Sequence, residues 1–165
     1  MPELSVCIVN WNTRDYLSAC LESLRAHAGD LEMEVIVVDN ASSDGSAQMV
    51  AEQHPWVRLI ALDENRYYAA GNNIALREAT APNVLLLNPD IVIEPGSVQH
   101  LATFLEEHPR AGAVAPRLRQ PDGSIQLTCR SFPDPDVVIS EALGLSRLFP
   151  RSRRFGKYRM SWWDY

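Results

Sequence analysis

Val84-Leu85-Leu86-Leu87-Asn88-Pro89-Asp90-Ile91-Val92-Ile93-Glu94 is the stretch that decides the fold expected for this chain. An apolar run leads directly into Asn-Pro-Asp, and a continuous apolar run bounded by turn residues is typical of a strand buried on both faces. Pro89 cannot donate to a sheet ladder, so the strand is expected to end before it. Asp90 would then lie at the carboxyl end of a central strand, where open α/β sheets bind ligands.

Apolar strands alternate with helices in the part of the chain that precedes this stretch. Strands are expected at residues 4–9, 34–38 and 57–62. A helix at about residues 69–79 is expected to turn Ala70, Ile74 and Ala75 inward. Strands that alternate with helices form βαβ units. We therefore expect an α/β fold with a Rossmann-like, mostly parallel sheet flanked by helices on both faces.

The pattern changes after residue 94. A helix is expected to open at Pro95 and to close near His108, and a short strand of small residues is expected at 111–115. Pro121-Asp122-Gly123 predicts a hairpin turn, and residues 137–145 predict one more helix. Prolines accumulate after residue 130, so we expect an α/β domain at residues 1–130 and a second region at residues 131–165.

Composition excludes several classes of protein. The chain has 165 residues, enough for a real core, and a net charge of −6, which argues against nucleic acid as the main partner. No apolar run approaches the ~20 residues of a membrane span, and the amino terminus lacks the basic region of a signal peptide. Cys7, Cys20 and Cys129 lack metal-type spacing and are interpreted as free thiols. These features predict a cytoplasmic protein.

The last residues of the chain are both basic and aromatic. Residues 147–159 carry several cations and no carboxylate, with Phe149, Phe155 and Tyr158 interleaved among them. One interpretation is a solvated tail. The other is a surface that contacts an anionic lipid carrier or the inner face of the cytoplasmic membrane.

Polar residues end three of the expected strands. They lie at positions 10–12, 39–40 and 88–90. The carboxyl ends of parallel strands meet at one edge of a sheet, and polar residues that converge there mark a ligand crevice.

Four sequence blocks occur in a fixed order: residues 9–12, residues 35–46, Asn65 with residues 69–73, and residues 85–90. In order and spacing they resemble the family 2 glycosyltransferases, and within that family the rhamnosyltransferase-like bacterial branch. The resemblance runs from about Leu4 to at least Ser131. It implies the glycosyltransferase A-type fold, with residues 1–130 as a nucleotide-sugar-binding domain and residues 131–165 as the start of the acceptor side.

The resemblance also implies roles for residues of the first two blocks. Asp39 would receive the nucleobase, because a carboxylate can accept a hydrogen bond from the N3–H of uracil or thymine. Val9, Asn10, Trp11 and Asn12 would line the nucleoside pocket. Two alternatives stay open: Asp39 can serve only as a turn residue, and Trp11 can pack under the sheet.

Asn88-Pro89-Asp90 matches the family's Asp-x-Asp metal motif, with an amide in place of the first carboxylate. Mg²⁺ or Mn²⁺ takes oxygen ligands, commonly carboxylates together with substrate phosphates and water. Such a metal neutralises the charge of the departing nucleoside diphosphate. With Asn88 neutral, Asp90 is the expected metal ligand of the protein. The alternative is a plain Asn-Pro-Asp turn.

Residues 65–73 depart from the family pattern. The family has Asn-x-Gly-Phe where this chain has Asn65-Arg66-Tyr67-Tyr68. Glycine permits a positive φ, which Tyr67 is not expected to adopt easily, so this loop is expected to sit differently. The expected donor contacts outside the first block are Asn40, Asn65, Asn72, Asn88 and Asp90.

The resemblance implies an inverting glycosyltransferase that moves a sugar, suggested to be rhamnose from dTDP-L-rhamnose, to a glycan or a lipid-linked acceptor. Inverting transfer needs a general base, which the family carries in an acidic motif in the second half of the domain. Asp122, Asp134, Asp136 and Glu141 do not match that motif. The base is therefore expected beyond Tyr165, and the chain is expected to be the donor-binding half of a longer enzyme.

Other classes of protein remain as alternatives. One is a non-catalytic nucleotide-sugar-binding module, and this class would explain why the general base is missing. A dehydrogenase would carry Gly-x-Gly-x-x-Gly after the first strand, and a nucleotidyltransferase a glycine-rich basic loop near the start. The first strand here leads instead into Asn10-Trp11-Asn12.

Overall fold

The structure is a computed structural model that describes residues 1–163. Its contacts divide the chain into two compact units, Met1–Val114 and the part from Ala115 onward. The expected donor-binding domain extends to residue 130, and that functional boundary stays a prediction.

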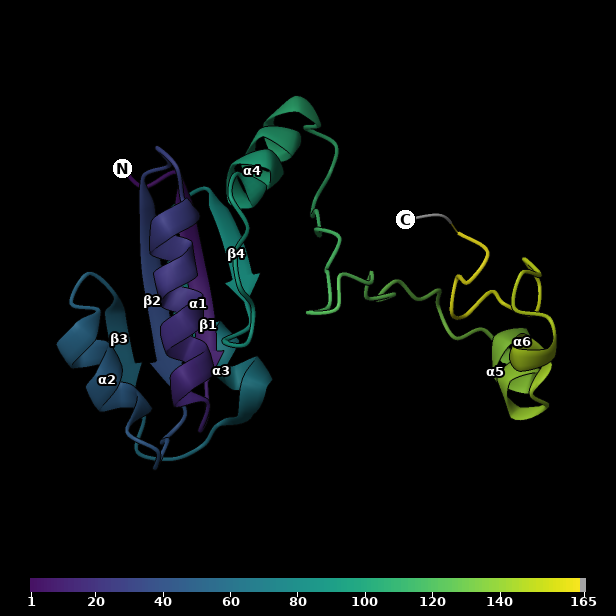
Figure 1. The fold of residues 1–165 in the computed structure, drawn as a ribbon, viewed down its shortest axis with the longest axis horizontal. Coiled ribbons are helices and arrows are strands. Elements are labelled where there is room, and N and C mark those ends of the chain that lie inside the picture. The colour runs from purple at the N-terminus through teal and green to yellow at the C-terminus, as the bar shows by residue number, and fades with distance from the viewer. Residues whose placement is uncertain (164–165) are drawn as a thin grey trace. The chain divides into compact units, whose positions relative to one another are not determined.

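The first unit is built on a four-stranded parallel sheet (Figure 1). Its strands are β1 (Leu4–Asn10), β2 (Met33–Asp39), β3 (Arg58–Ala61) and β4 (Asn83–Leu87), in the order β3-β2-β1-β4. The helices are α1 (Arg14–His27), α2 (Ser46–Gln53), α3 (Tyr67–Glu78) and α4 (Ser97–Glu107). The alternation of strands with helices confirms the expected α/β fold.

Side chains of successive strand residues point to opposite faces, so β1 serves two cores. Val6 and Ile8 join the cluster under α1, α2 and α4, whereas Cys7 and Val9 join the cluster under α3. Helices therefore cover both faces of the sheet, as expected.

Gly71 allows α3 to lie close to the sheet. A Cβ atom at this position would lie 2.8 Å from Cγ1 of Val9 and 3.4 Å from Nδ2 of Asn40. Real Cβ atoms do not approach other carbons that closely, so any larger residue would push the helix away. The buried face of α3 consists of Gly71, Asn72 and Ala75. Ala70 is exposed, so its expected inward orientation is wrong.

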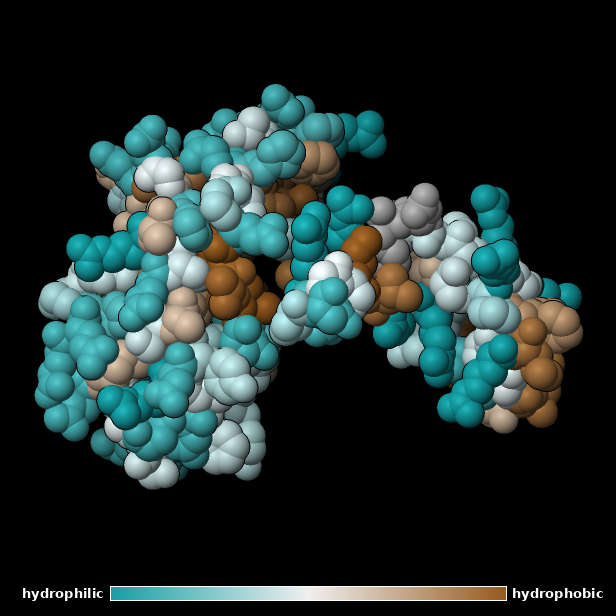
Figure 2. Space-filling model, viewed as in Figure 1, coloured by the Kyte–Doolittle hydropathy of each residue, from teal (hydrophilic) through white to brown (hydrophobic). Residues whose placement is uncertain are grey.

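The expectation that residues 84–87 form a central strand buried on both faces is wrong. β4 ends before Asn88 as expected, but among the described strands it has only β1 as a neighbour. Leu85 and Leu87 face the core under α1, whereas Val84 is 40% and Leu86 50% exposed. Figure 2 shows apolar surface over β4. A continuous apolar run does not tell which of its two faces is covered.

The second unit contains two short helices, α5 (Pro135–Ala142) and α6 (Leu145–Leu148). The turn at residues 121–123 closes a single antiparallel bridge between Arg119 and Ile125, which confirms the hairpin turn in a minimal form. Residues 111–115 form no strand, so that expectation is wrong.

Basic residues of the second unit contact other groups of that unit. Lys157 pairs with Asp134, and Arg159 with Glu141. The guanidinium of Arg153 lies 5.2 Å from the ring centre of Trp162. Residues 147–163, interpreted from the sequence either as a solvated tail or as a lipid-contacting surface, are thus part of a folded unit. No helix in the described part of the chain is long and apolar enough to cross a bilayer.

Candidate functional site

The carboxyl edge of the sheet brings the ends of β1 and β2 together. Asn10 and Asp39 are register partners, and both side chains are buried. Nδ2 of Asn10 donates a hydrogen bond of 2.8 Å to Oδ1 of Asp39. Oδ1 of Asn10 accepts a hydrogen bond of 2.6 Å from the Thr13 hydroxyl, which does not cap α1. These contacts fix the side chains of Asn10 and Asp39 at this edge of the sheet in the absence of a ligand.

The Asp39 carboxylate already accepts several hydrogen bonds. Oδ1 receives the Ser42 hydroxyl at 2.7 Å as well as Asn10, and Oδ2 receives the Ser42 amide at 2.9 Å. The turn interpretation of Asp39 therefore has a firm structural basis. A carboxylate offers about four lone-pair sites, so Oδ2 keeps capacity for one more donor.

The loop after β1 is joined to the loop after β2. Oδ1 of Asn12 accepts the Ser43 amide at 2.8 Å, and the Asn12 amide donates to the Ser42 hydroxyl at 2.9 Å. Asn12 has a positive φ of 54°. Trp11 is 56% exposed, so it does not pack under the sheet. Its ring is open for stacking, whereas Val9 is buried in the core below.

Asn40 holds the loop that leads into α3. Its side chain is buried; Oδ1 accepts the Arg66 amide at 3.2 Å, and Nδ2 donates to the Tyr67 carbonyl at 3.5 Å. These bonds give Asn40 a structural role at the site, and a direct contact with a donor stays a prediction.

Tyr67 adopts the backbone conformation that glycine takes easily. Its φ is 61°, and its amide donates to Oδ1 of Asn65 at 2.7 Å. The expectation that tyrosine would not adopt a positive φ at this position is therefore wrong. The bonds from Asn40 and Asn65 hold the strained backbone in place. One turn later, Nδ2 of Asn72 donates to the Tyr68 carbonyl at 2.9 Å.

Asn88 and Asp90 follow β4 at the same edge of the sheet. The Asn88 carbonyl accepts the Cys20 thiol at 3.7 Å, and the Asn88 side chain accepts the Tyr68 hydroxyl at 3.2 Å. Burial, together with the nearby charge of Asp90, raises the pKa of Cys20 to about 12, so this thiol stays protonated. Asp90 itself is exposed, and within residues 1–163 no group donates a hydrogen bond to its carboxylate.

The donor set at this edge fits a metal ion that is shared with a substrate. In the described residues no group of three or more His, Cys, Asp or Glu side chains could hold an ion alone. Asp90 offers one open carboxylate, whereas the side-chain oxygen of Asn88 beside it already accepts the Tyr68 hydroxyl. Mg²⁺ and Mn²⁺ commonly complete such a set with phosphate oxygens and water.

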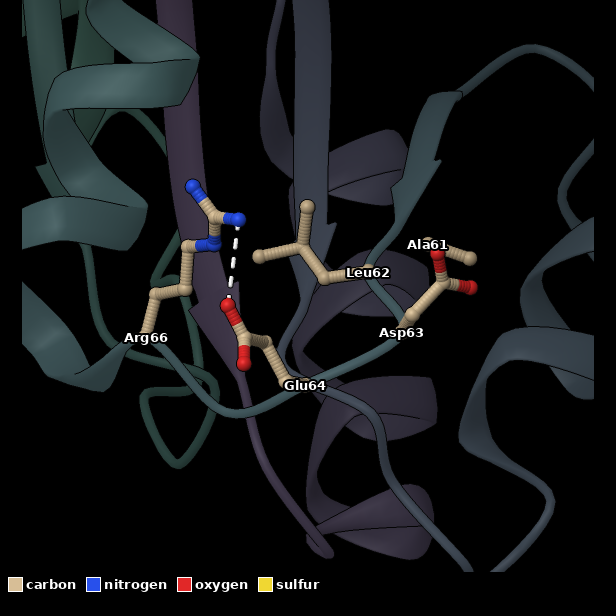
Figure 3. A pocket seen from close by; sticks show the side chains of 5 residues that line it. All are labelled: Ala61, Leu62, Asp63, Glu64 and Arg66. Atoms are coloured by element: carbon tan, nitrogen blue, oxygen red, sulfur yellow. Dashed lines mark ion pairs between the residues drawn. The ribbon is translucent and has the colours of Figure 1, made fainter.

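A hollow lies at the carboxyl end of β3. It has a volume of about 410 Å³ and is lined by Ala61, Leu62, Asp63, Glu64 and Arg66 (Figure 3). The Leu62 amide donates to the Asp39 carbonyl, so the hollow begins beside Asp39, the residue expected to receive the nucleobase. Its size is within the range of small-ligand sites. Asp63 and Glu64 were not among the expected site residues, although acidic residues directly after a strand are a signal for this edge.

Comparisons with known proteins identify the family. The family model described as "Glycosyl transferase family 2" matches residues 5–160. N-acetylglucosaminyl-diphospho-decaprenol L-rhamnosyltransferase of Mycobacterium tuberculosis is 32% identical over 141 residues, covering 79% of this chain and 46% of that protein. Succinoglycan biosynthesis protein ExoO of Rhizobium meliloti is 32% identical over 114 residues, covering 68% of this chain and 32% of that protein.

Solved structures show the same architecture. Mannosyltransferase PcManGT from Pyrobaculum calidifontis, in complex with GDP-Man and Mn²⁺, has a TM-score of 0.63 and 28% identity, covering 73% of this chain and 36% of that one. S. aureus TarS 1-349 in complex with UDP-GlcNAc has a TM-score of 0.57 and 29% identity, covering 64% of this chain and 32% of that one.

This chain belongs to glycosyl transferase family 2, and its first unit has the glycosyltransferase A-type fold. The resemblance to the family, which includes a rhamnosyltransferase relative, is confirmed. The chain spans about half the length of the first curated relative that it matches.

Proposed function

We propose that the first unit binds a nucleoside-diphosphate sugar and forms the donor half of an inverting glycosyltransferase. One observation carries the proposal: Asp39, Trp11 and Asp90 lie at the carboxyl ends of β2, β1 and β4, along one edge of the sheet. Asp39 supplies a buried hydrogen-bond acceptor for the base, and Trp11 supplies an exposed ring for the nucleoside. Asp90 supplies an open carboxylate for a metal-bound diphosphate.

Each of the groups along this edge binds a different part of the donor. The remaining acceptor site of Asp39 receives the base N–H, and the Trp11 ring stacks against the nucleoside. Asp90 holds Mg²⁺ or Mn²⁺, with Asn88 beside it. When bound, the metal neutralises the charge that develops on the departing diphosphate. The exposed position of Asp90 supports this assignment, because it leaves the carboxylate open to such an ion.

The curated relative suggests the substrates. It is named as an L-rhamnosyltransferase that acts on an N-acetylglucosaminyl-diphospho-decaprenol. We propose dTDP-L-rhamnose as the donor and a sugar-diphospho-lipid as the acceptor of the whole protein. An acceptor of this kind lies in a membrane, so the protein would work at the inner face of the cytoplasmic membrane.

A thermal-shift panel of nucleoside diphosphates tests the donor site. We expect dTDP or UDP to raise the Tm of this chain when Mn²⁺ is present, because the ligand binds only the folded state. Asp90→Ala is expected to abolish the shift. Asp30→Ala, which removes an exposed carboxylate before β2, is expected to preserve it. Stabilisation by NAD alone, or by no nucleotide, would overturn the proposal.

A second candidate function is a nucleotide-sugar-binding module without catalysis. Incubation of this chain with a labelled nucleotide sugar separates the two. Transfer or hydrolysis that is lost in Asp90→Ala would exclude the module.

A further inference from the structure

Tyr68 and Asn88 join two segments that are far apart in the sequence. Tyr68 lies in the first turn of α3, and Asn88 follows the last residue of β4. The Tyr68 hydroxyl donates a hydrogen bond of 3.2 Å to Oδ1 of Asn88. No other hydrogen bond to the Asn88 side chain occurs within residues 1–163. The hydroxyl is therefore the group that sets the orientation of this carboxamide.

The orientation decides what Asn88 can offer a ligand. A carboxamide has an accepting oxygen on one side and a donating NH₂ on the other. Since the oxygen points to Tyr68, the NH₂ group points elsewhere, and Asn88 is exposed. A diphosphate presents only acceptors at neutral pH, so it needs donors or cations. With its oxygen held by Tyr68, Asn88 meets that need as a donor.

The backbone of Tyr68 is itself held on both sides. Before it, Tyr67 is fixed in its left-handed conformation by bonds from Asn40 and Asn65. After it, Nδ2 of Asn72 binds the Tyr68 carbonyl at 2.9 Å. A side chain on so firmly held a backbone can orient a neighbour at little cost in entropy.

We propose that Tyr68 is a positioning residue that turns the Asn88 carboxamide so that its NH₂ group donates to a diphosphate oxygen of the bound nucleotide. Asn88 then acts as a hydrogen-bond donor, and Asp90 is left as the protein's metal ligand. This proposal rests on the proposed donor site.

A double-mutant cycle on nucleotide affinity tests this proposal. The dissociation constant of dTDP or UDP is measured by titration calorimetry in Mn²⁺ for the unaltered chain, Tyr68→Phe, Asn88→Ala and the double variant. Loss of one hydrogen bond is worth about 2–10-fold in affinity, so Tyr68→Phe is expected to weaken binding by that factor. In the Asn88→Ala background the same change is expected to have no effect, because the hydroxyl then has no carboxamide to orient.

Two controls separate positioning from damage to the fold. Tyr68→Phe is expected to keep the Tm of the ligand-free chain, since the hydroxyl is at an exposed site. Tyr16→Phe, which removes a hydroxyl from an exposed tyrosine of α1, is expected to keep the affinity.

The outcomes also separate this proposal from the donor site itself. Equal affinity of Tyr68→Phe and the unaltered chain, or losses that simply add in the double variant, would overturn the role of Tyr68 alone. Failure of the unaltered chain to bind any nucleoside diphosphate would overturn both proposals.

Discussion

At the scale of single residues, Tyr67 carries backbone strain next to the site. A left-handed backbone costs an L-residue about 1–2 kcal/mol, and a bulky side chain rarely adopts it. Asn12 and Ala41 share this conformation, with φ of 54° and 56°, and they too follow strands at the carboxyl edge. Three of the four non-glycine residues with positive φ in the described part of the chain thus lie where the ligand is proposed to bind, as is common at functional sites, and the fourth, Met160, lies in the second unit.

The strain at Tyr67 can be measured by comparing two substitutions. We expect Tyr67→Gly to be more stable than Tyr67→Ala by about 0.5–1 kcal/mol, because only glycine is free of strain at φ 61°. At Leu76, exposed later in the same helix, the order should reverse, since alanine favours helix interiors by about 1 kcal/mol over glycine. Urea unfolding of the four variants is the measurement. The same order at both positions would contradict the strain.

Gly71 gives a second prediction at this scale. Gly71→Ala is expected to lower the free energy of unfolding by about 1–3 kcal/mol, because the new methyl overlaps Val9. Gly112→Ala, where the added carbon meets nothing within 4 Å, should change it by less than about 0.5 kcal/mol. Chemical denaturation measures both. Equal effects would show that close packing at Gly71 does not matter.

Residue types at the site could be predicted from the sequence better than residue partners. Asp39 ends β2, and Asn88 and Asp90 follow β4, so their place at the carboxyl edge was predictable. The bonds from Asn40 to the loop before α3 and from Tyr68 to Asn88 were not, because they join segments that the sequence keeps apart. The positive φ at Tyr67 was predictable only from the family's glycine, and the tyrosine argued against it.

At the scale of elements, Glu34 ties β2 to the loop between α3 and β4. Its carboxylate accepts hydrogen bonds from the Ser5 hydroxyl and from the amides of Thr80 and Ala81. Burial opposes ionisation of Glu34, but these hydrogen bonds outweigh it and lower the pKa of the carboxyl below its usual value. The charged form is therefore the one that holds the loop.

This contact makes stability depend on pH. Because the pKa of Glu34 is lower in the folded chain, its contribution is present above the ordinary glutamate pKa of about 4.3 and is lost as the pH falls through the folded value. We expect Glu34→Gln to be less stable than the unaltered chain at about pH 7, with a gap that narrows toward about pH 3. Unfolding curves at both pH values measure this. A difference in the free energy of unfolding that is the same at both pH values would contradict this role of Glu34. The control Glu106→Gln, at an exposed position of α4, should be as stable as the unaltered chain at both pH values.

Helices and strands with strong periodicity were predictable, and their surroundings were not. Residues 84–87 are all apolar, yet Val84 and Leu86 lie on a face that no described element covers. Residues 111–115 are small and apolar but form no strand. In both cases the outcome depends on which neighbours are present, and a local pattern does not contain that information.

At the scale of the whole molecule, charge is divided unevenly along the chain. Residues 1–114 hold six basic against sixteen acidic residues, a net charge of −10. Residues 115–165 hold nine basic against five acidic residues, a net charge of +4. The second unit also exposes apolar side chains on and beside α5 and α6 (Figure 2), among them Ile139, Leu143 and Leu148. Cations beside exposed apolar groups are typical of surfaces that bind anionic lipid.

We expect the chain to co-sediment with anionic vesicles at low salt and not with zwitterionic ones. The double variant Arg147→Glu/Arg151→Glu should reduce binding, because each cation near an anionic surface contributes about 1 kcal/mol. The double variant Arg77→Glu/Arg110→Glu, an equal charge change at exposed positions of the first unit, serves as the matched control and should bind like the unaltered chain. Equal binding by both variants would remove the lipid contact.

The position of β4 at the end of the sheet has a consequence for amide hydrogen exchange. In an edge strand, alternate amides point toward the neighbouring strand or away from it. Those of β4 that face β1 should exchange slowly with deuterium, and the ones between them quickly. In β1, residues 4–8 have partners on both sides, and every amide of that stretch should be protected. If another strand pairs with the free edge of β4, the outward-facing amides of β4 should then exchange slowly as well. Hydrogen exchange would therefore detect such pairing without a structure of the complex.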